Sequence, residues 1–579
     1  MQTGESQALL SSGMALEDPA FDKLGYAGFA ETLANGIQKM VPSEGLVIAV
    51  YGAWGSGKTT MLNFVEHYAR KAPEGKRPII FRFNPWWFSG AEELTLHFFT
   101  ELRLVLGKSP GFGKQLLTNL ADLADIVSEQ TPYAPLGKLA AFGLRKAAQQ
   151  KRDVIELKRE IANALNEQNN IILIVMDDID RLTADEIRQV FRLIKAVADF
   201  PNVVYLLAFD KKVIVEALRE MQGLPGENYL EKIVQVPFEL PLPSSGSLQK
   251  LLFAELDVIL ADTPNGMFDA THWGNVFIDG VRHFIATPRD VVRLTNTLHV
   301  TYPAVRGEAN PVDFIAIETL RVFCPLAYDF VRKNPFMFTG HTGPMDRPQD
   351  LKPLHEEWMK DIQKEDLEAV KSLLIRLFPK FQAAWENIHY PAEFESIWRR
   401  DRRVCSPDVF PVFFSLTVLE GNISNYEMRA ALSLVNDANA FAARLLQFAN
   451  QKRPDGTTRA PVFLDQFMDY YKEIPVGSIA PVIQALFDVG DKLLVPEDEP
   501  RGLFEDRNEI RIGRIIWHLL PRLDEEQRFS ILSDAMTKGQ ALSIIVHTAS
   551  DLARQHGKYG AKPDPPEKRF LTIDHAEQL

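Results

Sequence analysis

Residues 51–60, YGAWGSGKTT, place glycines, a lysine and a threonine at a spacing that suits phosphate chemistry. Gly52, four further residues and then Gly57-Lys58-Thr59 have the order of a phosphate-binding loop. Glycines let the backbone curve so that its N–H groups converge on a phosphate. The ammonium adds positive charge, and the hydroxyl is a ligand for Mg²⁺. We therefore predict a site for ATP and Mg²⁺ that is formed by Gly52, Trp54, Gly55, Ser56, Gly57, Lys58, Thr59 and Thr60.

A pair of carboxylates follows an apolar run further along the chain. Residues 171–180, IILIVMDDID, end this run in Asp177 and Asp178. A carboxylate at a strand end beside a phosphate loop can hold Mg²⁺ through water, and its neighbour can orient or deprotonate an attacking water. We therefore assign Asp177, with Thr59, to the metal and Asp178 to catalysis. Asp180 and Arg181 have either a direct role or form a structural ion pair.

Arginines and one further aspartate complete the candidate residues. Residues 287–296, TPRDVVRLTN, place Arg289 and Arg293 four positions apart, on one face of an expected helix. An arginine from a lid helix can stabilise charge that develops on a transferred phosphoryl group. We predict this catalytic role, beside Lys58 and Asp178, for Arg289. The alternative for both arginines is a surface ion pair with Asp290 or nearby glutamates.

Asp210 follows another apolar run, residues 203–209. A polar residue at this position could lie beside the terminal phosphate. It could equally cap the next helix, because aspartate is a preferred N-cap residue. The sequence leaves both alternatives open.

The elements that must position these residues follow an α/β order. Near-continuous apolar runs separated by helical patterns predict a parallel sheet covered on both faces. The runs are 46–52, 78–84, 171–177, 203–209 and 233–238. The phosphate loop lies between the first run and a predicted helix over 59–71. A second helix is predicted after Thr183, which has capping-box spacing to Glu186.

We predict three regions along the chain. A P-loop NTPase core over 1–240 carries a helical insertion at about 91–168, a helical lid spans 241–305, and a mostly helical partner-binding region spans 306–579. Within the lid, 241–250 reads as a linker, and Thr287 is the expected N-cap of a helix with Pro288 in its first turn. The stretch 557–568 reads as a frayed or disordered end.

Composition limits the class of protein. The chain has 579 residues and a formal net charge of -13, which disfavours nonspecific coating of nucleic acid. Two cysteines and an acidic N-terminus without a basic segment predict no disulfide framework and no signal peptide. No run of 18 apolar residues occurs, so we expect no membrane span and a cytoplasmic protein. The basic run 398–403, WRRDRR, either contacts phosphates or is ion-paired.

Several motifs together resemble the KAP family of P-loop NTPases. They are YGAWGSGKTT, FRFNPWWFSG, IILIVMDDIDRL, VVYLLAFDKKVI, YLEKIVQVPFELP and TPRDVVRLTN, and they span about residues 16–302. The resemblance implies an ATPase of the class with an additional catalytic-carboxylate strand and a helical lid. It maps the phosphate loop onto 52–60, the metal and catalytic acids onto Asp177 and Asp178, and the lid arginine onto Arg289.

The same resemblance implies a biological setting. Many family members carry transmembrane helices between the two nucleotide motifs, whereas the insertion here is polar. Bacterial relatives are associated with phage exclusion and anti-phage defence. The length and soluble character here are similar to those of the ATPase in a multi-gene defence system of the Qat type, which pairs it with a nucleotide-modifying enzyme and a TatD-like nuclease.

Two functional hypotheses follow. The leading one is a cytoplasmic ATPase that switches or assembles a defence complex, with its C-terminal half binding proteins from neighbouring genes or further copies of the chain. The alternative is a nucleic-acid motor, such as a translocase or a helicase-like enzyme. The acidic net charge disfavours nucleic acid as the direct ligand. The sequence does not distinguish ATP from GTP.

Overall fold

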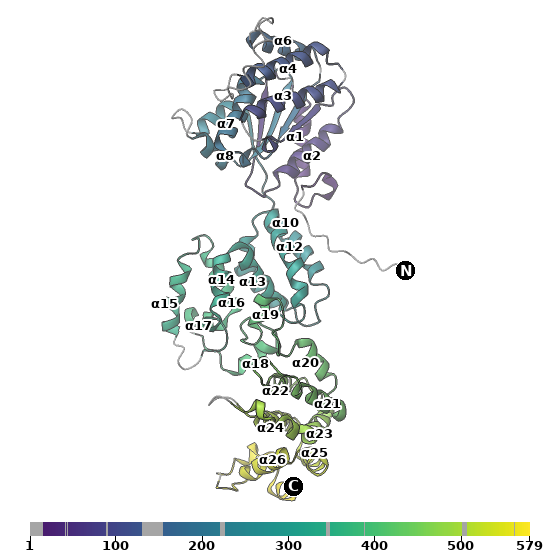
Figure 1. Cartoon of the computed structure of the whole chain (residues 1–579), viewed down its shortest axis with the longest axis vertical. Helices are drawn as coiled ribbons and strands as arrows, with labels where there is room; N and C mark the ends of the chain where they lie inside the picture. The colour runs from purple at the N-terminus through teal and green to yellow at the C-terminus, as the bar shows by residue number, and fades with distance from the viewer. Residues whose placement is uncertain are drawn as a thin grey trace, which may run out of the picture. The chain divides into compact units, whose positions relative to one another are not determined.

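The computed structural model describes most of the chain as two compact units (Figure 1). The described residues are 15–40, 42, 44–88, 91–109, 111–129, 154–168, 170–219, 226–342, 348–386, 388–500, 506–560 and 562–579. The α/β unit comprises Leu9–Ala254 and Ile285–Arg293. The helical unit comprises Glu255–Phe284 and Leu294–Leu579. Two helices, α10 (Ser245–Ile259) and α12 (Pro288–Val305), contribute residues to both units.

The α/β unit is built on a five-stranded sheet of order β2-β3-β4-β1-β5, in which every pairing is parallel. The strands are β1 (Leu46–Tyr51), β2 (Ile79–Phe83), β3 (Ile172–Met176), β4 (Val203–Phe209) and β5 (Val236–Glu239). All five predicted strands are therefore confirmed. Because β4 lies between β1 and β3, the sheet has the order expected for the additional-strand class of P-loop NTPases.

The register brings the carboxyl ends of the strands to one edge of the sheet. Tyr51 at the end of β1 pairs with Phe209 at the end of β4. Met176 at the end of β3 pairs with Phe83 at the end of β2 and with Leu207. The residues that follow β1, β2, β3 and β4 therefore emerge side by side, at the edge where ligands bind in open α/β sheets.

Helices cover both faces of this sheet (Figure 1). Alternate residues of β1 point to opposite sides, so that Val47 and Ala49 belong to one apolar cluster and Ile48 and Val50 to the other. The first cluster is completed by α3 (Ala91–Gly107), α4 (Lys114–Glu129), α6 (Val154–Asn166), α7 (Ala184–Arg192), α8 (Lys211–Leu218) and α9 (Gly226–Ile233). The second is completed by α1 (Ala27–Ile37) and α2 (Lys58–Arg70).

The helical insertion is part of the core of this unit. Phe98 and Phe99 of helix α3 are completely buried. The ring of Phe98 contacts the rings of Phe81 and Phe83 on β2. Residues 110 and 130–153 of the predicted insertion lie outside the described residues. The predicted capping box of α7 is present, with Thr183 and Glu186 bonded reciprocally. This helix continues as a π-helical turn over Leu193–Val197 rather than as a regular helix.

The helical unit is α-helical, in agreement with the predicted C-terminal region. Its further helices are α11 (Ala270–Asp279), α13 (Pro311–Phe323), α14 (Pro325–Lys333), α15 (Pro348–Met359), α16 (Leu367–Leu377), α17 (Pro379–Glu386), α18 (Glu393–Arg400), α19 (Phe410–Ser415), α20 (Asn425–Leu432), α21 (Ala438–Ala449), α22 (Ala460–Met468), α23 (Ile479–Val489), α24 (Asn508–Leu519), α25 (Glu525–Lys538), α26 (Leu542–Gln555) and α27 (Ile573–Gln578). None of the described helices has the length and apolar character needed to cross a membrane.

Two sequence predictions about irregular segments were wrong. The expected linker over 241–250 becomes helical at Ser245, because the Ser244 hydroxyl accepts from the backbone N–H of Ser247 and so satisfies a free donor of the first turn. Within the expected frayed end over 557–568, the Asp564 N–H donates to the Gln555 carbonyl at 2.9 Å and Pro566–Lys568 form a 3-10 turn. The chain after it returns to the core. Phe570 stacks on Trp517, with ring centroids 4.7 Å apart, and Leu571 is 2% exposed.

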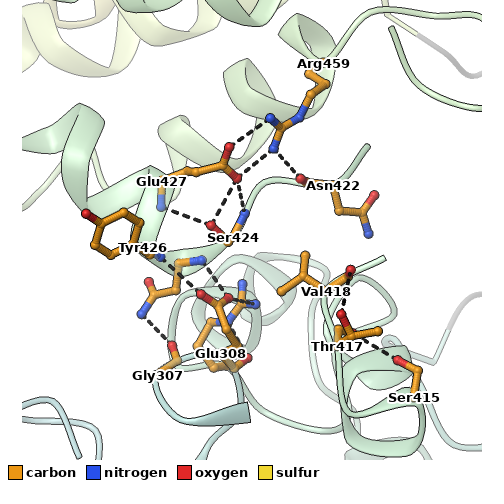
Figure 2. Close-up of polar contacts among 12 residues, drawn as sticks. Gly307, Glu308, Ser415, Thr417, Val418, Asn422, Ser424, Tyr426, Glu427 and Arg459 are labelled. Carbon is orange, nitrogen blue, oxygen red and sulfur yellow. Dashed lines mark hydrogen bonds and ion pairs between the residues drawn. The ribbon is translucent and has the colours of Figure 1, made fainter. Parts of the chain in front are cut away.

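A polar joint connects two parts of the helical unit (Figure 2). Glu308, shortly after α12, accepts from the backbone N–H groups of Asn425 (2.7 Å) and Tyr426 (3.2 Å) in the first turn of α20. The Arg402 guanidinium donates to the same carboxylate and to the Glu308 carbonyl. A carboxylate at a helix N-terminus satisfies free donors and complements the helix dipole. The joint therefore fixes α20 relative to the end of α12.

Candidate functional site

The phosphate loop connects β1 to α2 in a conformation that requires its glycines. Gly55 and Gly57 have φ angles of 84° and 97°, which side chains rarely tolerate. A Cβ at Gly52 would lie 2.7 Å from the Ser56 hydroxyl oxygen. The hydroxyl of Tyr26 donates to the Ser56 carbonyl at 2.6 Å and fixes the loop from the α1 side. The predicted loop residues therefore form one compact cradle at the N-terminus of α2.

Lys58 is held inside this cradle. Its side chain is only 9% exposed, and its ammonium donates to the Gly52 carbonyl at 2.9 Å. The same ammonium lies 3.3 Å from a carboxylate oxygen of Asp180, which also accepts from the backbone N–H of Asp210 at 2.8 Å. Asp180 thus links the phosphate loop to the end of β4. The Asp210 side chain accepts from Lys212 N at 2.9 Å and is the N-cap of α8, one of the two alternatives that the sequence left open.

Asp177, which follows β3, has the properties of a metal ligand. It is 5% exposed, and burial raises the pKa of its carboxyl group. A hydrogen bond with the Thr59 hydroxyl opposes this rise, as does one from the Asp178 N–H at 2.9 Å. The two residues predicted to hold Mg²⁺ therefore touch one another. Arg82 Nη2 lies 3.9 Å from Asp177 Oδ2 and also opposes the rise of the pKa. A buried carboxylate beside a hydroxyl fits a divalent cation with oxygen ligands.

Asp178 lies beside Asp177 with an unusual backbone conformation. Its φ of 58° is in the left-handed region, which is uncommon for residues other than glycine. One carboxylate oxygen, Oδ1, lies 2.7 Å from Arg181 Nε. The other, Oδ2, accepts from the amide of Asn84 at 3.4 Å. The sequence alone assigns no role to Asn84, although its position directly after β2 places it at this edge of the sheet.

Arg289 also reaches the phosphate loop, at the start of α12. Its guanidinium carbon lies 5.0 Å from the centre of the Trp54 ring, and a Cβ at Gly55 would lie 2.7 Å from Arg289 Cβ. Arg293, one helical turn further, lies 4.0 Å from Asp290. The structure therefore brings Arg289 to the loop and gives Arg293 an ion pair within its own helix.

Trp54 has a second guanidinium over its ring. Arg181 lies 5.9 Å from the centre of Trp54 and 5.1 Å from that of Trp86. Trp54 and Trp86 are 65% and 52% exposed, so these rings are held at the surface beside the loop. Arginine and indole rings thus alternate from Arg289 through Trp54 and Arg181 to Trp86.

The arginines of the basic run 398–403 form ion pairs. This is one of the two interpretations that the sequence left open, the other being contact with phosphates. The pairs are Arg399 with Asp408 and Asp469, Arg400 with Asp401 and Glu473, Arg402 with Glu308, and Arg403 with Asp313. These contacts use the positive charge of the run within the helical unit. They favour a structural role over contact with a nucleic-acid backbone.

Comparisons with known proteins agree with this geometry. The model of the KAP family P-loop domain matches residues 26–305. The Phage T7 exclusion protein of Escherichia coli (strain K12) is 22% identical over an alignment of 624 residues, which covers 98% of this chain and 82% of that protein. The solved structure of the Aeropyrum Pernix ORC2 protein (ADPNP-ADP complexes) covers 58% of this chain and 79% of its own, at 13% identity and a TM-score of 0.28, which is too low to support an inference.

Proposed function

We propose that this chain, a member of the KAP family of P-loop NTPases through residues 26–305, binds and hydrolyses ATP with Mg²⁺ as a nucleotide-driven switch or assembly factor in anti-phage defence. One observation carries the proposal. Lys58, Thr59, Asp177, Asp178 and Arg289, which come from three separate segments, converge at one edge of the sheet.

Each of these residues has a role that its position supports. Lys58 and the loop N–H groups would bind the terminal phosphates, for which the ammonium would exchange its contact with Asp180. Thr59 and Asp177 would hold Mg²⁺, which supplies positive charge that neutralises the phosphate oxygens when bound. Asp178 would orient or deprotonate the attacking water. Arg289 would move from Trp54 to the phosphoryl oxygens as their charge grows.

The biological part of the proposal rests on the relative and on the helical unit. The relative is a phage exclusion protein, and its alignment covers almost the whole of this chain. We propose residues 1–240 as the NTPase core, 241–305 as the lid, and 306–579 as the region that binds proteins from neighbouring genes or further copies of this chain. We place the protein in the cytoplasm.

Hydrolysis is tested by Asp178→Asn in the full chain. The amide keeps the shape of the side chain but cannot act as a base, so ATP affinity is expected to stay within about twofold while kcat falls by about 10² or more. Asp185→Asn is the matched control, because Asp185 lies on α7 with a side chain that is 88% exposed. If Asp178→Asn hydrolyses ATP as fast as wild type, Asp178 is not a catalytic residue.

The switch is tested by light scattering with ATP, ADP and no nucleotide, using Asp178→Asn to retain ATP and including the products of neighbouring genes. We expect the assembly to differ between the ATP and ADP states. A monomer that binds none of these proteins in any state would contradict the switch. Strong stimulation of hydrolysis by bare DNA would instead favour the nucleic-acid motor.

A further inference from the structure

The two carboxylate oxygens of Asp178 are held differently. Arg181 Nε binds Oδ1 at 2.7 Å, a short charge-assisted contact. The Asn84 amide approaches Oδ2 only to 3.4 Å, so this oxygen retains most of its capacity to accept hydrogen bonds. The pairing with Arg181 therefore fixes which oxygen of Asp178 is left to contact a water.

Arg181 would not hold this position through the ion pair alone. Its side chain is 39% exposed, and exposed ion pairs contribute little because ordering a long side chain costs entropy. A planar guanidinium stacked on an aromatic face loses less freedom and gains a cation–π contact. The Trp86 ring, at 5.1 Å, provides the nearer of the two faces over Arg181.

The position of Trp86 is in turn set by Asn84. The Asn84 side-chain oxygen accepts from the Trp86 backbone N–H at 3.0 Å and caps the short 3-10 turn Pro85–Trp87. Pro85 at the first position of this turn fixes φ without losing a needed donor. Asn84, Trp86, Arg181 and Asp178 thus form a closed ring of contacts at the ends of β2 and β3.

We infer that Arg181 is a positioning residue for Asp178, and that the Trp86 ring holds Arg181 in the orientation that aims Asp178 Oδ2 at the attacking water. This inference rests on the proposed hydrolysis of ATP. It gives a function to the Asn-Pro-Trp sequence after β2, to which the sequence assigned none, and it joins the two alternatives that the sequence left open for Arg181. Neither Arg181 nor Trp86 would contact the nucleotide.

The first test separates turnover from binding in the full chain. In Arg181→Ala, kcat is expected to fall by about 10- to 100-fold, because small displacements of a catalytic group have effects of this size. The ATP dissociation constant, measured by calorimetry, is expected to stay within about twofold of wild type. In an Asp178→Asn background the same substitution should have no further effect on kcat, because both changes remove one function.

The second test addresses the contact between the Arg181 guanidinium and the Trp86 ring. Trp86→Ala is expected to reproduce most of the loss in kcat, and Trp86→Phe to restore it, because phenylalanine keeps an aromatic face. Trp87→Ala is the matched control, since Trp87 lies in the same turn with 74% exposure and the ring over Arg181 is that of Trp86. A kcat in Trp86→Ala equal to that of Trp87→Ala would overturn the role of the ring.

Other outcomes overturn the positioning role itself. An increase of kcat in Arg181→Ala would mean that Arg181 restrains Asp178 from acting. Equal losses in kcat and ATP affinity would mean that the substitution damages the fold of the site. If wild type binds ATP without hydrolysing it, the proposed function fails before any variant is compared. The inference alone fails if wild type hydrolyses ATP and Arg181→Ala does so equally well.

Discussion

His355, on α15 in the helical unit, should make this unit sensitive to acid. The ring is completely buried and packs against Phe338 and Phe381. Its Nδ1 accepts from the Trp358 indole N–H at 3.2 Å, so the neutral ring carries its proton on Nε2. Protonation would place a second N–H against the indole donor and a charge in an aromatic core. Burial accordingly lowers the pKa of His355 from 6.5 to about 4.

The sign of the effect follows from the direction of this pKa change. The folded pKa lies below the unfolded one, so between pH 6.5 and about 4 the unfolded state binds more protons. The stabilisation is complete above pH 6.5 and is lost as the pH falls toward 4. A pKa difference of about 2.5 corresponds to about 3 kcal/mol.

Hydrogen exchange measures this loss locally. We expect the protection of amides in α15 and α17, corrected for the intrinsic exchange rate, to fall by about 10² between pH 7 and pH 4.5. In His355→Gln the side-chain oxygen still accepts from Trp358 but does not titrate, so this part of the pH dependence should vanish. The reasoning is refuted if wild type and His355→Gln lose protection equally over this range.

Three further predictions concern the site and the joint. Lys58→Ala should weaken ATP binding at least tenfold, a loss of about 1.4 kcal/mol in binding free energy. An unchanged ATP affinity in calorimetry would show that Lys58 does not bind the phosphates. Arg289→Ala should lower kcat more than ATP affinity, because the charge that it meets grows in the transition state; equal losses would indicate uniform binding. Glu308→Gln leaves Arg402 without its carboxylate and should reduce the local stability of α20 by about 2 kcal/mol, measured by hydrogen exchange. Unchanged exchange there would show that the joint is not stabilising.

The strands, the phosphate loop and the cap of α7 could be predicted because their signals are local. The strands β1, β3 and β4 are continuous apolar runs, and Gly52 to Thr59 has fixed spacing in the sequence. Once the runs are placed in a parallel sheet, the positions of Asp177 and Asp178 beside the loop follow from strand geometry alone. This part of the site needs no long-range information beyond strand order.

The segments that could not be predicted depend on contacts made far along the chain. The stretch 557–568 has the composition of a disordered end, but the residues after it supply Phe570 to Trp517 and Leu571 to the core. The composition of a segment does not reveal whether its neighbours bury apolar surface elsewhere. The run 398–403 is similar, because its basic residues find their carboxylates on other helices, as Arg403 does with Asp313.

For Asp180 and Arg181, the sequence left two alternatives open, a structural ion pair or a role in the site. The structure shows that the two alternatives do not exclude one another. Asp180 pairs with Lys58, and Arg181 pairs with Asp178. Each pair therefore fixes a residue that the chemistry would use, and an ion pair of this kind acts on the site through its partner. Arg293 differs, because its partner Asp290 accepts from the Thr287 N–H and hydroxyl, both at 2.8 Å, and so serves the start of α12. The contribution of an ion-paired residue to the site therefore depends on the role of its partner in the pair.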